Sequence, residues 1–387
     1  MGTMTRLCLF AGAHGGATGA YQGFIALYLQ AAGLNVRQVG MVMAAAPLAC
    51  ILAQPCWGAL GDKARRKGWV LALMAGLSAA LLLALPLGRG LGMAGLLAIN
   101  TLFAACFTAL QPMGDAQLLA ALGRGKGFGQ VKLWAGLAFA LASLAGGYMA
   151  RRGPGWALAL AAALLGLTGV AALGLPERQK EKGTKKGGGW ARVLKLPGFL
   201  PLLLPAAMAQ MGLGYFYTFF PARFMDLPGG TTQRLGLCYL IGAVSEIPLL
   251  LYFDRLVERW SAGKLLAGGA FLLAVRMALL SLGGPLGLAI AGQALSGVGA
   301  CVLTTGLARE IGRLTPPGLR ARGQTLASAM SYALARAIGN LTGGRLTAGL
   351  GLEWGFGIAS ALCLTAALLF GWIGRGQPIG SPGKART

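Results

Sequence analysis

Long apolar stretches, separated by short polar gaps, run along almost the whole chain. Each is about 20 residues long, the length that an α-helix needs to cross a bilayer. Gly and Pro recur inside the stretches, as membrane helices tolerate, because small residues let helix backbones approach closely. The pattern predicts an all-α membrane protein with twelve transmembrane helices, at about 7–30, 38–60, 69–87, 92–121, 130–150, 156–175, 199–220, 236–253, 264–283, 285–308, 324–347 and 354–374.

Composition agrees with this prediction. Of 387 residues, 56% are hydrophobic and 11% charged, whereas soluble domains carry about 25% charged residues. Soluble, secreted disulfide-rich and disordered classes are therefore excluded. The first apolar stretch leads into further spans without a small-residue cleavage site, so a removable signal peptide is not expected. The seven cysteines lie in apolar stretches without a CxxC pair or metal-ligand spacing, as packing residues do: Cys8, Cys50, Cys56, Cys106, Cys238, Cys301 and Cys363.

The formal net charge is +24, but its distribution argues against nucleic acid as a partner. Nucleic-acid binders gather Lys and Arg on one face, whereas here they fill the gaps between apolar stretches. With both termini in the cytoplasm, 25 of the 34 Lys and Arg residues flank the spans on the cytoplasmic side, seven lie in outer loops, and Arg276 and Arg336 lie inside spans. This bias predicts cytoplasmic termini in a plasma or inner membrane.

A polar segment rich in Lys and Gly divides the chain into two halves. Its composition predicts a flexible cytoplasmic linker at 176–197, between a six-helix bundle at 1–175 and a second one at 198–387.

The two halves resemble each other. FALASLAG at 139–146 recurs as YALARAIG at 332–339, which puts Arg336 in the place of Ser143, and shorter matches recur at similar offsets, Gly129-Gln130 with Gly323-Gln324 and Asp62 with Asp254. Matches near half the chain length indicate a duplicated unit. Parallel repeats of this kind are typical of transporters whose two halves rock around a central site.

The stretch WGALGDKARRKGW (57–69) concentrates charge between two apolar spans. We interpret GDKARRKG as a cytoplasmic turn of about eight residues, in which the carboxylate can meet a helix N-terminus or an arginine. Topology anchoring alone is the alternative.

This turn resembles the signature loop of the major facilitator superfamily, which latches the two halves in one state and releases them in the other. The resemblance implies a conformational latch with these candidate residues: Gly58, Asp62, Lys63, Arg65 and Arg66. Nearly the whole chain resembles lactose permease and its relatives, which include the oligosaccharide–proton symporters and the phenylpropionate permease group. The matching stretches are GAYQGFIALYL (19–29), QPCWGALGDK (54–63), FGQVKLWAGLAFA (128–140) and AVRMALL (274–280).

The resemblance implies a substrate site in the first half. By position, Asp115 and Lys132 correspond to the carboxylate and the cation that bind substrate hydroxyls, and Phe139 to the aromatic residue that stacks on a sugar ring. Lys replaces the family's Arg, and Phe replaces its Trp. A carboxylate accepts from hydroxyls and an ammonium group donates to them; a purely structural salt bridge is the alternative.

Ionisable side chains inside spans of the second half are candidates for proton coupling, because lipid penalises buried charge. Desolvation favours the protonated carboxyl group, so Glu246 in span 8 can carry a proton near neutral pH; a structural pair with an arginine is the alternative. Arg276 matches the family's coupling arginine by resemblance. Arg336 is expected to pair with Glu246 or to attract an anionic substrate.

Span 10 lacks the His and Glu that the resemblance would place there for proton handling. Its polar candidates are Gln293 and Ser296, so coupling must depend on Glu246 or Asp115, or be absent. His14, the single histidine, is expected either to bond a backbone carbonyl or to line the cavity. Tyr21 and Gln22 either line the cavity or pack in the core.

We therefore expect a monomeric secondary active transporter with two pseudo-symmetric six-helix bundles, the major facilitator fold. It takes up a small polar organic solute (a sugar, a nucleoside or an aromatic acid) by alternating access, with the proton as coupling ion and no cofactor. A proton-driven exporter and an uncoupled facilitator are the alternatives. No nucleophile–base–acid set or metal-ligand spacing occurs, so an enzyme is not expected.

Overall fold

The computed structural model describes residues 2–122, 127–176, 190–316 and 319–376, and these are helical almost throughout. The first half contains α1 (Thr3–Gln22), α2 (Ile25–Ala31), α3 (Val36–Lys63), α4 (Lys67–Gly90), α5 (Gly92–Leu122), α6 (Gly127–Met149), the short 3₁₀ helix η1 (Ala150–Arg152) and α7 (Pro154–Leu173). The second half follows α8 (Trp190–Leu194) and contains α9 (Phe199–Asp226), α10 (Thr232–Arg259), α11 (Ala262–Ser281), α12 (Leu286–Leu314), α13 (Arg320–Ala327), η3 (Ser328–Leu334), α14 (Ala335–Leu350) and α15 (Leu352–Gly376).

These helices confirm the prediction of an all-α membrane protein with twelve spans. Within the described residues, nine helices are by themselves long and apolar enough to cross a membrane. The other three spans are α1 with α2, the more polar α10, and α13, η3 and α14 in succession. The third of these contains a π-helix, η3, a variation that is frequent at functional sites.

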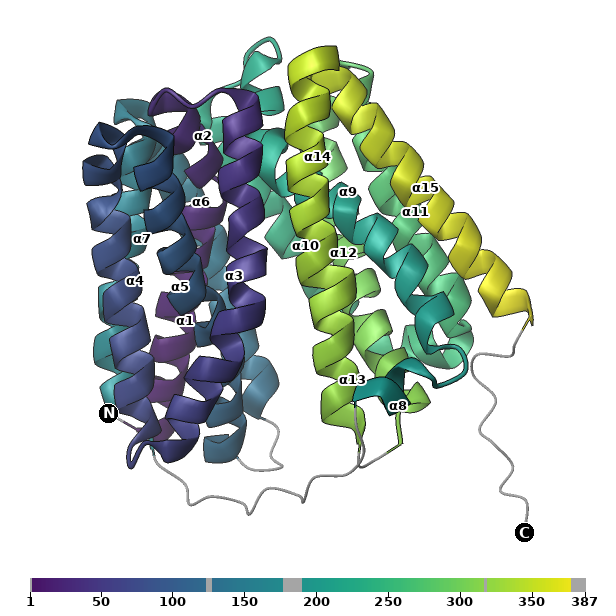
Figure 1. Cartoon of the computed structure of the whole chain (residues 1–387), viewed down its shortest axis with the longest axis horizontal. Helices are drawn as coiled ribbons and strands as arrows, with labels where there is room; N and C mark the ends of the chain where they lie inside the picture. Colours follow the sequence, from purple (N-terminus) through teal and green to yellow (C-terminus); the bar gives the residue numbers. More distant parts are fainter. Residues whose placement is uncertain (1, 123–126, 177–189, 317–318, 377–387) are drawn as a thin grey trace.

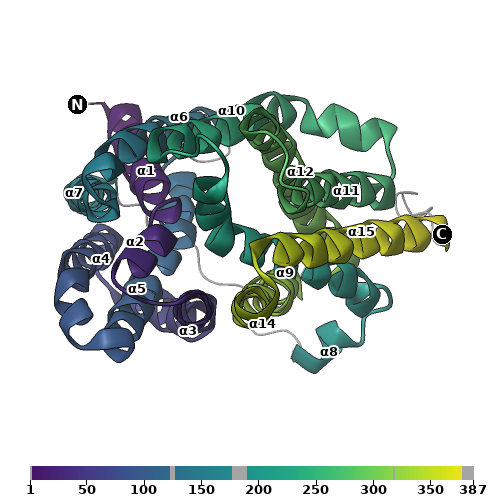
Figure 2. The same ribbon diagram turned by 90° about the horizontal axis from the view of Figure 1, so that it is seen from above.

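The helices form two bundles that stand side by side (Figures 1 and 2). Each bundle has its own apolar core. The chain enters α1 and leaves α15 at the same end, called here the terminal end, at the bottom of Figure 1. Residues 177–189 of the predicted linker lie outside the described residues. The part of the linker that the structure describes contains a short helix, α8.

The bundles meet at the opposite end, where α3 packs on α14 and α6 packs on α10. Glycines make both contacts close: a Cβ atom on Gly40 would lie 2.9 Å from the Cα atom of Gly344, and one on Gly147 would lie 3.1 Å from that of Gly236. A third apolar cluster, with Phe24 from the first half, joins the two bundles there.

These contacts correct the register of the internal repeat. A Cβ atom on Gly40 would meet the carbonyl oxygen of Asn340, and one on Gly236 would meet that of Ser143, each at 2.6 Å. Asn340 therefore occupies the place of Ser143, at an offset of 197 residues rather than 193. The prediction that Arg336 replaces Ser143 was wrong by about one helical turn, and the π-helix just before Arg336 interrupts the regular α-helical register on that span.

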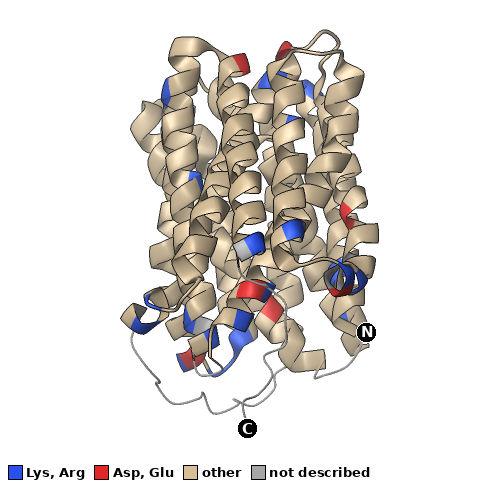
Figure 3. Ribbon diagram, turned by 90° about the vertical axis from the view of Figure 1, so that its right-hand side faces the viewer, with Lys and Arg blue, Asp and Glu red and all other residues tan. Residues whose placement is uncertain are grey.

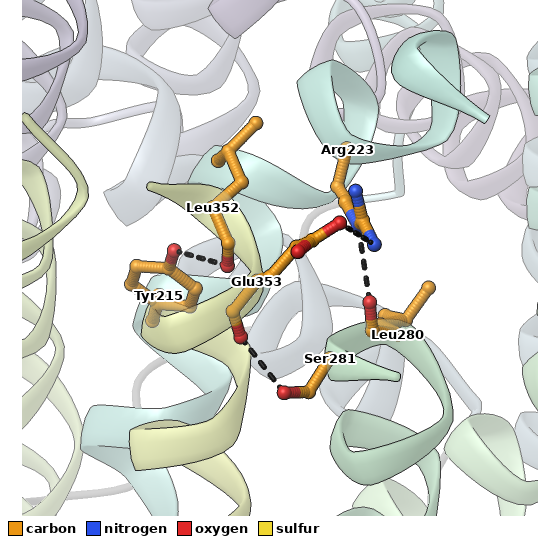
Figure 4. Close-up of polar contacts among 6 residues, drawn as sticks. All are labelled: Tyr215, Arg223, Leu280, Ser281, Leu352 and Glu353. Carbon is orange, nitrogen blue, oxygen red and sulfur yellow. Dashed lines mark hydrogen bonds and ion pairs between the residues drawn. The ribbon is translucent and has the colours of Figure 1, made fainter. Parts of the chain in front are cut away.

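Polar contacts secure the second bundle at the opposite end (Figure 4). Buried Arg223 on α9 forms an ion pair with Glu353 on α15 at 2.9 Å and donates to the carbonyl oxygen of Leu280 on α11 at 3.0 Å. Ser281 donates to the Glu353 carbonyl oxygen at 2.9 Å. These contacts lie within one bundle and hold three of its helices together.

The turn between spans 2 and 3 is shorter than predicted. Helix α3 continues through Lys63 and α4 starts at Lys67, which leaves three residues between them. A Cβ atom added to Gly58 would meet no described atom of a neighbouring helix within 4 Å, so Gly58 makes no close helix contact. A close contact occurs at Gly61, where a Cβ would lie 2.7 Å from the Met113 methyl group. Asp62, Lys63, Arg65 and Arg66 are exposed.

Candidate functional site

A cavity of about 780 Å³ lies between the two bundles, within the range of sites for small ligands. Helices α1, α5 and α6 supply one wall, and α9, α10 and α12 supply the other. Towards the terminal end its lining residues Gln111, Gly129 and Gln130 are exposed, whereas Tyr239 and Gln293 are buried. Seven predicted residues and Ser296 line this cavity: His14, Gln22, Asp115, Lys132, Phe139, Glu246 and Gln293.

An ion pair marks the first-half wall. Lys132 Nζ on α6 donates to Asp115 Oδ2 on α5 at 2.6 Å, and both side chains are about one-third exposed. The Lys132 ammonium group also lies 5.6 Å from the centroid of the Phe128 ring. Because both charged groups are partly exposed, solute hydroxyls can bond to them without disrupting a dry core.

Glu246 faces the first-half pair from α10 in the second half. Its side chain is half-buried, and no ion pair joins it to another described residue. The predicted pairing of Glu246 with Arg336 is therefore absent. A carboxyl group that meets the cavity without a neighbouring cation can gain or lose a proton without breaking a salt bridge.

Three buried polar atoms on the cavity residues have no hydrogen-bond partner among the described residues. They are His14 Nδ1, the Tyr239 hydroxyl oxygen and Gln293 Nε2. One of the two alternatives predicted for His14 was a hydrogen bond to a backbone carbonyl group. The Nδ1 atom of His14 makes no such bond to a described residue. Buried polar atoms are nearly always paired, so three unpaired atoms around one cavity indicate a site that a polar ligand or water completes.

Arg276 lies behind the second-half wall and is only 1% exposed. It donates to Gln293 Oε1 at 2.8 Å and to Ser296 Oγ, both on α12. Its guanidinium carbon lies 3.4 Å from the centroid of the Phe216 ring. Arg276 is therefore next to the cavity but is not among the described residues that line it.

Two other predicted substrate residues lie outside the cavity lining. Tyr21 donates to Asn100 Oδ1 at 3.3 Å and packs on Phe103, with ring centroids 4.6 Å apart, so it belongs to the first-half core. Arg336 donates to Gln210 Oε1 at 2.9 Å, and its guanidinium carbon lies 3.9 Å from the Tyr332 ring centroid. The hydrogen bond turns Arg336 towards α9, and Arg336 is not among the described residues that line the cavity.

The aromatic residues of the second-half wall were not predicted from the sequence; they are Phe216, Tyr217 and Tyr239. A signal existed for one of them: Tyr239 precedes Glu246 by seven residues, which places both on the same face of a helix. Phe216 and Tyr217 carry no such signal, because several aromatic residues follow one another in α9.

The described residues contain no group of three or more His, Cys, Asp and Glu side chains that could hold a metal ion. A sequence profile of the MFS_1 like family matches residues 10–357. The chain belongs to this family. The transporter is 28% identical to the maltose permease of Geobacillus stearothermophilus over 338 residues, which cover 85% of this chain and 84% of that protein. It is 24% identical to the uncharacterized transporter YwbF of Bacillus subtilis (strain 168), over 81% of this chain and 79% of that protein.

Solved structures share the fold of this transporter. A mutant form of the nucleoside transporter NupG superimposes with a TM-score of 0.85 at 14% identity, covering 95% of this chain and 99% of that chain. A bacterial homolog of the human lysosomal transporter Spinster, in an inward-facing and unoccupied conformation, gives 0.75 at 12% identity, covering 98% of both chains. The relatives are transporters and not enzymes, and the chain is a multi-pass membrane transporter of the major facilitator type.

Proposed function

We propose that this transporter takes up a hydroxyl-rich solute of the sugar class together with protons, by alternating access. The observation that carries the proposal is the cavity, which both bundles line and which contains the Asp115–Lys132 pair opposite Glu246. The similarity to a maltose permease supports the choice of a sugar over a nucleoside or an aromatic acid.

Within this proposal, substrate hydroxyls donate to Asp115 and accept from Lys132, and the Phe139 ring packs against the apolar face of the sugar. The unpaired atoms of His14, Tyr239 and Gln293 complete the polar contacts. These roles fit the residue types and their common exposure to the cavity.

The end at which the cavity is exposed indicates which state of the alternating-access cycle this structure represents. Figure 3 shows most Lys and Arg residues near the terminal end, and membrane proteins keep such residues on the cytoplasmic side. We propose that the terminal end faces the cytoplasm of a plasma or inner membrane and that the protein acts as a monomer. The cavity then opens to the cytoplasm, and the contacts of α3 with α14 and of α6 with α10 close the outer side.

Glu246 is the proposed proton carrier, because it is the carboxyl group of the second-half wall and forms no ion pair with a described residue. Protonation before closure of the cavity would remove a charge that the dry occluded state penalises. Release of the proton into the cytoplasm would then reset the carrier. Exporter and facilitator remain the alternatives that the transport assay separates.

The test is uptake of radiolabelled maltose, uridine and phenylpropionate into right-side-out vesicles with an imposed inward proton gradient. We expect maltose to accumulate above its external concentration and to alkalinise the medium. Equilibration without accumulation would identify a facilitator, and proton-driven efflux from loaded vesicles would identify an exporter. No flux of any of the three solutes above that of protein-free vesicles would overturn the proposed substrate range.

A further inference from the structure

A buried arginine is joined to two polar residues of the second-half cavity wall. Arg276 on α11 donates to Gln293 Oε1 at 2.8 Å and to Ser296 Oγ, and both acceptors belong to side chains that line the cavity. The Phe216 ring, 3.4 Å from the guanidinium carbon, covers the arginine on one side. Three neighbours therefore fix the position of Arg276.

These contacts fix which polar atoms the wall offers to a ligand. A glutamine amide has one acceptor oxygen and an NH₂ group. Because Arg276 occupies the oxygen of Gln293, the amide nitrogen is left over, and it has no partner among the described residues. The Ser296 oxygen accepts from Arg276, so the Ser296 hydroxyl keeps its own hydrogen for donation. Gln293 and Ser296 are three residues apart on α12, and so share one helix face.

The charge of Arg276 is not matched by a carboxylate. Its neighbours are neutral acceptors and an aromatic ring, and no ion pair joins it to another described residue. The planar guanidinium fork directs its N–H groups at two acceptors in a fixed geometry, which the ammonium group of lysine on its flexible stem does not reproduce. The geometry thus depends on the shape of the arginine as well as on its charge.

We infer that Arg276 is a positioning residue, which presents the Gln293 amide and the Ser296 hydroxyl as paired donors to an acceptor oxygen of the solute. This inference rests on the proposed function and extends it to the second half of the site. The first-half carboxylate of Asp115 accepts from solute hydroxyls, whereas this donor pair selects hydroxyl, ring or glycosidic oxygens at the other end. Solutes without an acceptor at that end are excluded.

The decisive variant is Arg276→Lys, which keeps the charge and loses the fork. We expect the KM for maltose to rise roughly tenfold, because one or two hydrogen bonds that orient the donors are lost, while the maximal rate stays within twofold. In a Gln293→Leu/Ser296→Ala background, the change Arg276→Met should add less than a twofold rise, because its targets are gone. A wild-type KM for Arg276→Lys, or an equal effect of Arg276→Met in both backgrounds, would overturn the inference.

Arg223→Lys is the matched control, because it makes the same substitution at a buried arginine of the same bundle. Arg223 bonds Leu280 and Glu353 and lies outside the cavity lining. We expect its KM for maltose to be unchanged. A tenfold rise in this control as well would mean that any buried arginine in the bundle has this effect, which would also refute a positioning role.

A second measurement needs no solute and therefore separates this inference from the proposed function. In protein labelled with ¹⁵N-glutamine, the side-chain NH₂ signal that disappears in Gln293→Leu is assigned to Gln293. That signal should move in Arg276→Lys and remain in place in Arg223→Lys. An unmoved signal in Arg276→Lys would refute the positioning role, even if maltose proved not to be a substrate.

Discussion

A hydrogen bond between the two bundles gives the sharpest test of the alternating-access reasoning. Pro47 inside α3 has no N–H group, so the carbonyl oxygen of Met43, four residues earlier, cannot form its usual helical bond. Asn340 on α14 of the other bundle donates to this oxygen at 3.1 Å. The amide oxygen of Asn340 accepts from Thr218 at 3.0 Å, within the second bundle. The bond joins the halves at the opposite end and must break when that end opens.

The change Asn340→Ala removes the inter-bundle donor. Hydrogen bonds between membrane helices contribute about 0.6 to about 1.7 kcal/mol, and each 1.4 kcal/mol changes an equilibrium tenfold. If water replaces Asn340 at the Met43 carbonyl oxygen in the open state, the ratio of open to closed molecules at the opposite end should rise by about three- to sixteenfold.

Distances between two spin labels would measure this shift in lipid nanodiscs. Arg37 at the start of α3 and Leu350 at the end of α14 are exposed and provide label sites, after replacement of the seven native cysteines. We expect a longer-distance population to grow in Asn340→Ala. Thr218→Val is the control, because it removes the second bond of Asn340 within one bundle and keeps the bond to Met43. An unchanged distance distribution in Asn340→Ala, or an equal change in the control, would refute the role of this bond.

Three further outcomes follow from the cavity and its closure. Asp115→Asn removes a charge-assisted bond to Lys132 and an acceptor for solute hydroxyls, so the maltose KM should rise at least tenfold with little change in thermal stability; an unchanged KM would remove Asp115 from the site. Glu246→Gln should retain maltose exchange and lose accumulation driven by a proton gradient, and accumulation at the wild-type level would refute the proton assignment. Gly147→Val places a side chain against Gly236 across the bundle contact, so the spin-label distances should shift towards the open form; a closed distribution like that of the wild type would show that the contact tolerates the added bulk.

Much of the fold could be predicted from the sequence, because a helix crosses lipid only if about 20 consecutive residues are mostly apolar. Twelve apolar stretches predicted the twelve spans, and the internal repeat predicted the pairing of two bundles, both of which the structure confirms. The register of the repeat could not be predicted, because short apolar matches such as FALASLAG and YALARAIG do not reveal a π-helix within one span. The latch turn was predicted too long because its charged residues continue the helix as far as Lys63.

The candidate site was predictable in part. The family resemblance gave Asp115 and Lys132 as candidates, and the charge inside span 8 gave Glu246; all three line the cavity. Whether Tyr21, Arg276 and Arg336 line the cavity could not be predicted. Residues on the cavity face of a helix and residues on its other faces have equally apolar neighbours in the sequence. Helix rotation alone separates them from the lining residues.

By itself, the sequence determined the class of the protein: apolar length, scarce charge and the basic flanks of the spans dictate a multi-pass membrane protein, because the bilayer acts on composition and not on detailed geometry. The tertiary structure decided which polar groups meet. Only the packing of α11 against α12 puts Arg276 on Gln293, and only the contact of α14 with α3 puts Asn340 on the Met43 carbonyl oxygen. Such pairs depend on helix rotation and register, which small shifts change without altering the hydrophobic pattern.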